Sequence, residues 1–533
     1  MKGAEYIGTE LQERDFIPKF TKSLASLLAM ADVEVLIIGA GFSGICMAIK
    51  LLQAGNTNFV VLEKHADLGG TWLLNRYPGC KCDIPSHLYS YSFDLNPGWT
   101  SLYAGSSEIH RYIKNCASRH GVLPHVRFNS SVLSAVWDAG AALWRIEVEH
   151  QVVDVAAVGE HWWPPPPPAS RTSTILARFI VRAVGGLQTP RQPTIKGMEK
   201  FSGPAFHSST WDSSISLEGK TVAVIGTGAS SIQIVPEIAP LVKKLYVLQR
   251  SPAWILPKLD PTIPQRCRHL FMQFPFLVCL LAWLIFLIQE AVGFMILHRK
   301  SIRRVAQWVA KKHMHITIKD PNMRQKLEPN YEIGCKRLLL SSSFYPAVAR
   351  PNVELITNHI LEMRENDILI STSGQNGRRS LATDIIVYAT GFDLSPSLRV
   401  VGNSGLEYNQ AGYSSLLGTT KHGFPNFFTL FGFNTHATYT SQLVTIEAQV
   451  RYTMSCLNLM GHVARSIEPH GASERQYQEF LARRTPTTVW TSGGCKSWYL
   501  DSKTSYPFTI WPGSTVELIY LLWSAKPSDY SIN

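Results

Sequence analysis

This sequence has few charged residues and few cysteines, and its N-terminal segment does not have the pattern of a secretory leader. Only 17% of its 533 residues are charged, whereas 45% are hydrophobic and 11% aromatic. That composition excludes disordered, collagenous and coiled-coil chains. Nine cysteines, a small and odd number, exclude a disulfide scaffold and favour a reducing intracellular compartment. The first 30 residues mix Glu10, Glu13, Arg14 and Asp15 with short apolar pieces, so we expect an N-terminal arm and no secretory signal there.

Length and net charge set the next limits. A chain of 533 residues is long enough for two to four domains. The 51 Lys and Arg residues against 39 Asp and Glu give a formal charge of +12, which favours anionic partners: nucleic acid, a membrane surface or phosphorylated cofactors. The motifs below favour cofactors, and we expect no nucleic-acid partner and no metal.

A strand, a glycine loop and a helix follow one another near the N-terminus. The apolar run 33–38 leads into a loop and then into the apolar-periodic segment 45–54, and a second strand, 58–62, ends at Glu63. This order predicts a dinucleotide-binding βαβ unit, with a glycine-rich structural turn as the alternative. The loop residues expected at the pyrophosphate are Gly39, Gly41, Phe42, Ser43 and Gly44.

The same pattern occurs a second time. Strand 221–225 leads into another glycine loop, a helix to about residue 241 and strand 244–248, which is followed by Arg250 and Ser251. The loop residues expected to contact the second cofactor are Gly226, Gly228, Ser230 and Ser231.

The two repeats differ at one equivalent position. Glu63 lies 24 positions beyond Gly39, and Arg250 lies 24 positions beyond Gly226. An acid there accepts hydrogen bonds from a free ribose diol, whereas an arginine pairs with a 2′-phosphate. The first site therefore suits FAD (or NAD) and the second NADPH, unless Arg250 is only a solvated charge. Two dinucleotides on one chain imply hydride transfer from nicotinamide to flavin.

A motif between the repeats carries a family resemblance. Phe201, Gly203, His207, Trp211 and Asp212 stand at the fixed positions of F-x-G-x-x-x-H-x-x-x-W-[P/D], and this segment resembles the fingerprint of type I Baeyer–Villiger monooxygenases. Related flavin-containing monooxygenases usually have Tyr or Phe where Trp211 stands. The resemblance runs from about residue 33 to 525, and the chain looks most like fungal members that act in secondary metabolism.

Further segments resemble parts of the same family. They are 68–72 and 75–83, with Tyr89 beyond, at the flavin; 183–185 and 387–392 at two hinges; 334–338 around the active-site arginine; and 495–499 in the mobile loop over NADP.

The resemblance implies FAD, NADPH, O2 and a ketone, which becomes an ester or lactone through a C4a-peroxyflavin. It implies that Arg337 holds the developing negative charge and that Asp83 orients Arg337. It places Thr71, Trp72, Asp83 and Tyr89 at FAD, and Lys81, Arg250, Ser251, Lys336 and Trp498 at NADP. His207 and Trp211 would anchor the linker between the domains.

Three local features depart from the family pattern. Phe433 replaces a proline in Gly432–Thr435, which we expect to reshape the nearby substrate pocket. Residues 159–174 contain five consecutive prolines, which predicts an exposed inserted loop rather than a ligand for SH3-type domains. Cys80 and Cys82 are interpreted as packing residues beside the flavin.

An apolar stretch lies within the second repeat. Residues 276–288 are all apolar and 291–297 continue the run, with basic residues on both sides. A helical hairpin packed in the protein, a membrane-surface contact through 274–297 and a true span are the three interpretations. A span would separate the two halves of one nucleotide-binding fold, which argues against it.

We therefore expect an α/β protein with two Rossmann-like dinucleotide-binding domains and a helical insertion in the NADP domain. The expected boundaries are an arm at 1–30, an FAD domain at 31–190 and 388–533, an NADP domain at 191–252 and 330–387, and the insertion at 253–329. The predicted function is oxygenation of a bulky hydrophobic ketone. The two alternatives are oxidation of a nitrogen or sulfur centre, and a flavin-binding or membrane-associated protein without catalytic turnover. The expected location is intracellular, either cytosolic or membrane-associated.

Overall fold

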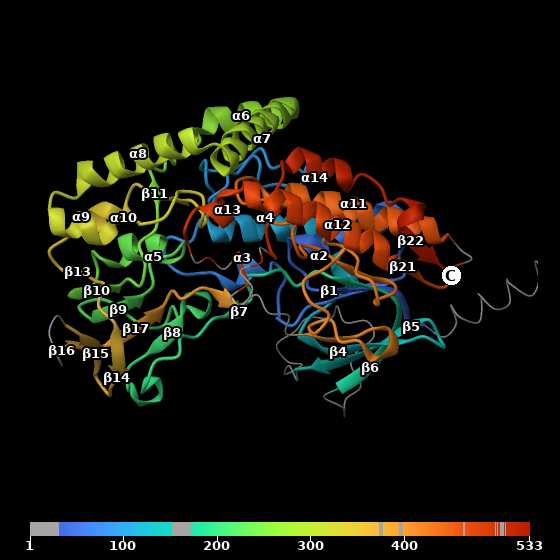
Figure 1. Cartoon of the computed structure of the whole chain (residues 1–533), viewed down its shortest axis with the longest axis horizontal. Coiled ribbons are helices and arrows are strands. Elements are labelled where there is room, and N and C mark those ends of the chain that lie inside the picture. The colour runs from blue at the N-terminus through green and yellow to red at the C-terminus, as the bar shows by residue number, and fades with distance from the viewer. Residues whose placement is uncertain are drawn as a thin grey trace, which may run out of the picture.

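The computed structural model describes residues 31–151, 172–372, 377–393, 398–461, 464–495, 497, 499–501, 506 and 508–533. The predicted N-terminal arm lies outside these residues, and so does most of the predicted proline-rich insertion. Its last residues, 172–174, are the start of strand β6 (Thr172–Arg182) and not part of a loop. Two sheets stand apart in the molecule, the larger on the right and the smaller on the left of Figure 1.

The first sheet has eight strands in the order β19-β4-β5-β6-β1-β2-β3, with β20 paired to β6. Its core is parallel, since β1 pairs in parallel with both β2 and β6. Helix α2 (Phe42–Gln53) is almost wholly buried between this sheet and α11. The strands are β1 (Val33–Ile38), β2 (Phe59–Leu62), β3 (Val126–Arg127), β4 (Ser130–Asp138), β5 (Leu143–His150), β6, β19 (Arg399–Val401) and β20 (Phe427–Thr429); the other helices are α3 (Thr71–Leu74), α4 (Ser106–Arg119), α11 (Gln442–Met460), α12 (Gly471–Arg484), α13 (Val489–Ser492) and α14 (Thr515–Leu521).

The second sheet has five strands, all parallel, in the order β13-β10-β9-β17-β8. A three-stranded antiparallel sheet, β14-β15-β16, packs beside it. Its elements are β8 (Ala205–His207), β9 (Thr221–Ile225), α5 (Ser231–Ile238), β10 (Lys244–Leu248), α10 (Phe344–Val348), β13 (Val353–Ile356), β14 (Ile360–Met363), β15 (Asp367–Ser371), β16 (Arg378–Ala382) and β17 (Ile385–Tyr388). The predicted α/β class with two Rossmann-like units is confirmed.

The two glycine loops are built alike. Gly39 has φ +105° and Gly226 has φ +112°, a region that favours glycine. A Cβ on Gly39 would lie 2.8 Å from the carbonyl oxygen of Ala183, and one on Gly226 would lie 2.4 Å from that of Ala389. Ala183 and Ala389 each follow the strand that lies parallel to the loop's own strand. In each repeat, therefore, the first loop glycine packs against a hinge.

The chain passes from one sheet to the other in two segments, and these two segments pair with each other as a short antiparallel ribbon. Strands β7 (Thr189–Pro190) and β18 (Phe392–Asp393) pair antiparallel, and the Thr390 hydroxyl donates to the Arg191 carbonyl oxygen at 2.5 Å. The fingerprint segment lies close by, because His207 ends β8 and its ring packs edge-on against Phe392 at 5.4 Å. This position agrees with the predicted anchoring of the linker.

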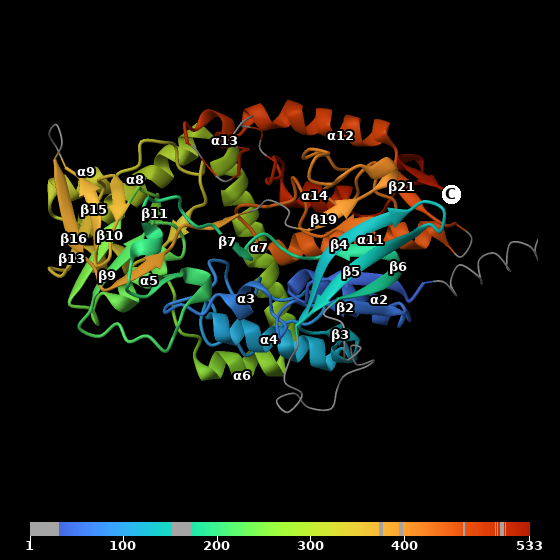
Figure 2. The same ribbon diagram turned by 90° about the horizontal axis from the view of Figure 1, so that it is seen from below.

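The predicted insertion is largely helical. Helices α6, α7 and α8 run along the upper edge of the molecule in Figure 1, and in the view of Figure 2 α7 passes between the two sheets. Residues 275–298 form one continuous helix that leaves most of its large apolar side chains exposed, so the packed hairpin is wrong. The elements are β11 (Ile255–Leu256), α6 (Gln265–Gln273), α7 (Pro275–His298), α8 (Lys300–Thr317) and α9 (Pro321–Leu327). β11 pairs with β12 (Leu339–Leu340), which follows the insertion, and β21 (Ile467–Pro469) pairs with β22 (Tyr530–Ile532) near the C-terminus.

The third glycine of the first loop offers a test of the loop packing. A Cβ on Gly44 would lie 1.9 Å from the Gly39 carbonyl oxygen, whereas one on Gly228 would meet nothing within 4 Å. We expect Gly44→Ala to lower the free energy of unfolding by about 3 kcal/mol, because backbone atoms must move. Gly228→Ala, the control, should unfold like the wild type in a urea titration. Equal stability of the two variants would contradict this packing.

Candidate functional site

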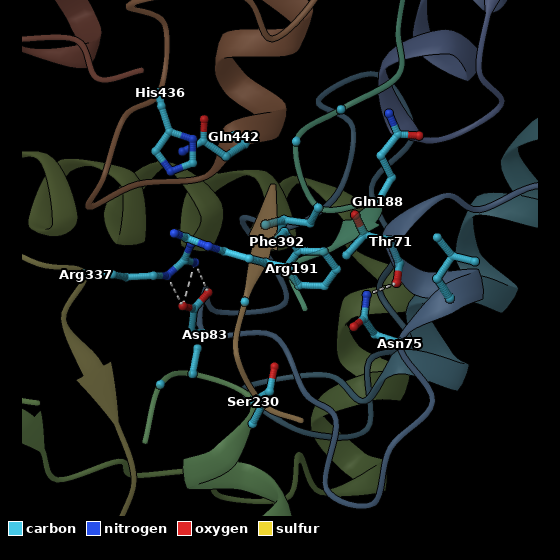
Figure 3. A pocket seen from close by; sticks show the side chains of 18 of the residues that line it. Thr71, Asn75, Asp83, Gln188, Arg191, Ser230, Arg337, Phe392, His436 and Gln442 are labelled. Carbon is cyan, nitrogen blue, oxygen red and sulfur yellow. Dashed lines mark hydrogen bonds and ion pairs between the residues drawn. The ribbon is translucent and has the colours of Figure 1, made fainter. Parts of the chain in front are cut away.

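A cavity of about 1980 Å³ lies between the two sheets. Pockets for one small ligand usually measure about 300–1,000 Å³, so this cavity has room for two dinucleotides and a substrate. Both glycine loops and both hinges line it, together with α7 and the segment after β20. Figure 3 shows the linker residues Gln188, Arg191 and Phe392 beside Thr71 and Asn75 of the first nucleotide-binding unit.

An ion pair joins the two sides of the cavity. The Arg337 Nε and Nη2 atoms donate to the two Asp83 carboxylate oxygens at 2.8 and 2.7 Å, and Figure 3 shows the pair facing the cavity. Arg337 stands just before β12, while Asp83 follows the loop after α3, 254 positions away in the chain. Asp83 is the first cause of the raised pKa of Arg337, which outweighs the opposing effect of burial. The guanidinium therefore stays charged and is fixed in direction.

A histidine that the sequence analysis missed lies close to this pair. His436 lines the cavity, and Figure 3 shows it with Gln442 near Arg337. Burial first, and then the Arg337 charge, lowers the pKa of His436 to about 3. Its imidazole is therefore neutral at any ordinary pH. The segment Gly432–Thr435, which the resemblance had placed near the substrate pocket, directly precedes His436 and was the signal that could have suggested it. The closeness of His436 to Arg337 comes from tertiary packing.

The residues predicted to hold FAD gather on the first sheet's side. Glu63 is buried at the end of β2, where its oxygens accept the backbone N–H groups of Ala40 at 2.8 Å and His65 at 3.0 Å. The Trp72 indole N–H donates to the Tyr89 hydroxyl at 3.1 Å. Gly44 does not line the cavity and instead allows the close approach of helix and loop. The residues predicted at FAD that line the cavity are Gly39, Gly41, Phe42, Ser43, Glu63, Thr71, Trp72, Asp83 and Tyr89.

A basic cluster lies at the end of β10. The Lys336 Nζ donates to the Ser251 hydroxyl at 3.1 Å, and both line the cavity with Arg250. Burial, and then the nearby Arg250 charge, lowers the pKa of Lys336. Two cations beside a hydroxyl donor suit a phosphate monoester.

The other residues predicted at NADP are divided. Gly226, Gly228 and Ser230 line the cavity, but Ser231 is fully buried in the first turn of α5 and does not. Lys81 lines it and pairs with Asp260 at 2.8 Å. Trp498 lies outside the described residues.

A disulfide that was not predicted ties the C-terminal segment to the arginine segment. Cys335 is bonded to Cys495, 160 positions later in the chain. Cys335 immediately precedes Lys336 and Arg337, and Cys495, Ser497 and Leu500 line the same cavity. The resemblance had placed these two segments near NADP separately, which was the signal that could have suggested their contact. One such bond among the described residues is not a disulfide scaffold.

The remaining predictions have these outcomes. Cys80 and Cys82 are free and buried, and both line the cavity, as their interpretation as packing residues implies. Phe433 packs among Tyr408, Tyr413 and Phe508 and does not line the cavity. The expected effect on the pocket comes from the backbone freedom that the missing proline leaves, and it stays a prediction.

Comparisons with known proteins agree with this geometry. A family model described as NAD(P)-binding Rossmann-like domain matches residues 37–105, and one described as flavin-binding monooxygenase-like matches residues 181–401. A crystal structure of cyclohexanone monooxygenase in its closed form superimposes with a TM-score of 0.81 at 24% identity, over 94% of this chain and 99% of that one, which supports the fold.

Two relatives align over most of the chain. An FAD-binding monooxygenase of Aspergillus niger is 34% identical over 87% of this chain and 76% of its own length. A Baeyer–Villiger monooxygenase of Pseudomonas aeruginosa is 39% identical over 91% of this chain and 89% of its own. With two glycine loops and a paired arginine facing one cavity, the chain belongs to the Baeyer–Villiger monooxygenase family.

Proposed function

We propose that the protein uses FAD and NADPH to insert one oxygen atom of O2 beside the carbonyl of a bulky hydrophobic ketone, giving an ester or lactone. The observation that carries the proposal is the Arg337–Asp83 pair inside the cavity that both glycine loops reach. The two sheets would be the cores of an FAD domain (31–190 and 388–533) and an NADP domain (191–252 and 330–387), with 253–329 as the insertion.

The first side of the cavity fits FAD. The Gly39–Gly44 loop leads into α2, whose first backbone N–H groups would face the pyrophosphate. Glu63 would accept hydrogen bonds from the ribose, since a carboxylate that already accepts two backbone N–H groups has acceptor capacity left. Bound flavin supplies electron transfer from NADPH and the activation of O2.

The second side fits NADPH. Arg250, Ser251 and Lys336 would hold the 2′-phosphate, and the N-terminus of α5 would face the pyrophosphate. Lys81 and Trp498 are proposed as further NADP contacts.

Arg337 would stabilise the negative charge that develops when the ketone carbonyl is attacked. Asp83 fixes the guanidinium through two hydrogen bonds, so little reorganisation is needed when that charge appears. Neutral His436 adds no second cation beside it.

The apolar side chains that line part of the cavity favour a hydrophobic ketone. The α7 wall of the cavity is formed by Ile288, Val292 and Ile296, and the α11 wall by Leu443 and Ile446. A polyketide or terpenoid biosynthetic intermediate is the proposed substrate class. We further propose an intracellular location with a membrane-surface contact through residues 274–297.

Replacing Arg337 separates the two halves of the reaction. We expect Arg337→Ala to reduce ester formation by at least about 10²–10³-fold, the usual effect of removing one preorganised donor, while NADPH still bleaches the bound flavin. Product analysis and stopped-flow absorbance measure the two steps. Arg364→Ala, which removes a surface arginine paired with Glu362, should change neither. Ester or lactone formation retained in Arg337→Ala would remove Arg337 from this role.

Coenzyme choice should depend on Arg250. A hydrogen bond to a charged group contributes about 1.5–3 kcal/mol, so Arg250→Ala should raise the KM for NADPH roughly 10- to 100-fold. The KM for NADH should hardly change, because NADH lacks the 2′-phosphate. Lys220→Ala, at an exposed lysine before β9, is the control. A parallel rise for both coenzymes would contradict the assignment.

The lowered pKa of Lys336 gives a pH dependence with a definite sign. Lys336 holds phosphate only when protonated, so kcat/KM for NADPH should fall as pH rises through its pKa, at lower pH than for an ordinary lysine. Lys336→Met should have a lower kcat/KM without this alkaline fall. An identical pH profile in the variant would show that another group titrates.

A further inference from the structure

The outer face of α7 is apolar along its whole length. Phe276, Leu280, Trp283 and Leu287 recur every three or four residues, so they share one face of the helix, with Leu284 beside them. Each of these five side chains is more than half exposed. By length and composition α7 is the one helix among the described residues that could cross a membrane. An uncharged exposed face of this size marks a contact surface.

The inner face of α7 is built into the protein. Glu290, its single charged residue between Pro275 and Leu297, is turned inward and accepts the Thr515 backbone N–H at 2.6 Å. A Cβ on Gly293 would lie 2.1 Å from the Tyr439 ring. These contacts hold α7 against the first sheet's domain and leave its outer face uncovered. The helix therefore lies on the protein surface and does not leave it.

Basic residues flank this face in the sequence. Between residues 265 and 317 there are eight Lys or Arg residues and a single Glu. Arg303 is buried and paired with Glu332, and Lys311 is paired with Glu328. The exposed basic residues include Arg266, Arg299, Arg304 and Lys312. Exposed apolar and basic side chains also alternate on α8, where Val305 and Trp308 are exposed and the Lys312 ammonium lies 5.0 Å from the Trp308 ring. Tryptophan beside lysine is typical of helices that lie at a lipid headgroup layer.

We infer that α6, α7 and α8 form a docking surface for an anionic membrane and that the ketone enters the cavity from that membrane. The charge identifies the occupant: phosphate headgroups complement the basic residues, and the acyl layer accepts the face of Phe276–Leu287. A second copy of the chain fits less well, because a two-fold dimer through this face would bring the basic residues of both copies together.

The route into the cavity follows from the position of α7. Ile288 and Val292 line the cavity and are also exposed, 55% and 44% respectively, next to the outer face. Ile296, one turn further, is buried and lines the cavity too. A hydrophobic ketone can thus pass from lipid along α7 without crossing water. This route rests on the proposed oxygenation of a ketone, whereas the docking surface does not.

Vesicle flotation of the full-length holoenzyme tests the surface. We expect the protein to float with vesicles of phosphatidylcholine and phosphatidylglycerol, and less with phosphatidylcholine alone or in high salt. Leu284→Glu/Leu287→Glu should weaken flotation at least about tenfold, because both side chains would lose their apolar environment. The matched control, Leu241→Glu/Leu361→Glu, adds the same charges at exposed leucines of the second sheet's domain and should float like the wild type.

Two results would overturn the docking surface. One is wild-type protein that stays unbound with anionic vesicles. The other is a dimer in light scattering that Leu284→Glu/Leu287→Glu dissociates, which would make a second copy the occupant.

Substrate delivery is measured separately. With vesicles present, Leu284→Glu/Leu287→Glu should slow oxygenation of a membrane-dissolved ketone several-fold and leave a water-soluble ketone and flavin bleaching unchanged. If the variant oxygenated the membrane-dissolved ketone as fast as the wild type does, the membrane route would be refuted. Wild-type protein that floats but oxygenates no ketone would refute the proposed oxygenation and leave the docking surface standing.

Discussion

The ion pair between Arg337 and Asp83 is the contact on which the arrangement of the cavity depends. It connects a segment beside the second sheet with a loop beside the first. A partly buried guanidinium without its carboxylate would lie in a low-dielectric cavity unpaired, which is costly. The pair therefore joins the two nucleotide-binding units and keeps the Arg337 guanidinium aimed at the space between them.

Both nucleotide-binding units have the same backbone geometry at the first glycine of the loop. In each, a glycine with positive φ packs against the carbonyl of a hinge alanine, so the loop and the interdomain crossing are positioned together. The units differ in charge at the strand ends, where one carries Glu63 and the other Arg250. Equal geometry with opposite charge is a simple way to hold two coenzymes that differ by a phosphate.

Patterns of neighbouring residues predicted the two nucleotide-binding units, because each unit is built from elements that are consecutive in the chain. The glycine loops, the strands around them, Glu63 and Arg250 lie at the cavity because strand, loop and helix follow in a fixed order. Lys336 and Arg337 also line it, but the family resemblance and no local pattern pointed to them. The contacts of His436 and the Cys335–Cys495 bond arise between distant segments, and periodicity carries no information about such pairings. The packing of α7 was wrong for the same reason: an apolar run indicates a helix but not what covers its faces.

The Cys335–Cys495 bond has a topological consequence. It closes a covalent ring that encloses every named helix and strand from β12 to α13. A protease that cuts the backbone anywhere inside this ring leaves a single covalently connected molecule. The piece bearing Lys336 and Arg337 would part from the C-terminal piece only after a reductant opened the ring and the protein unfolded.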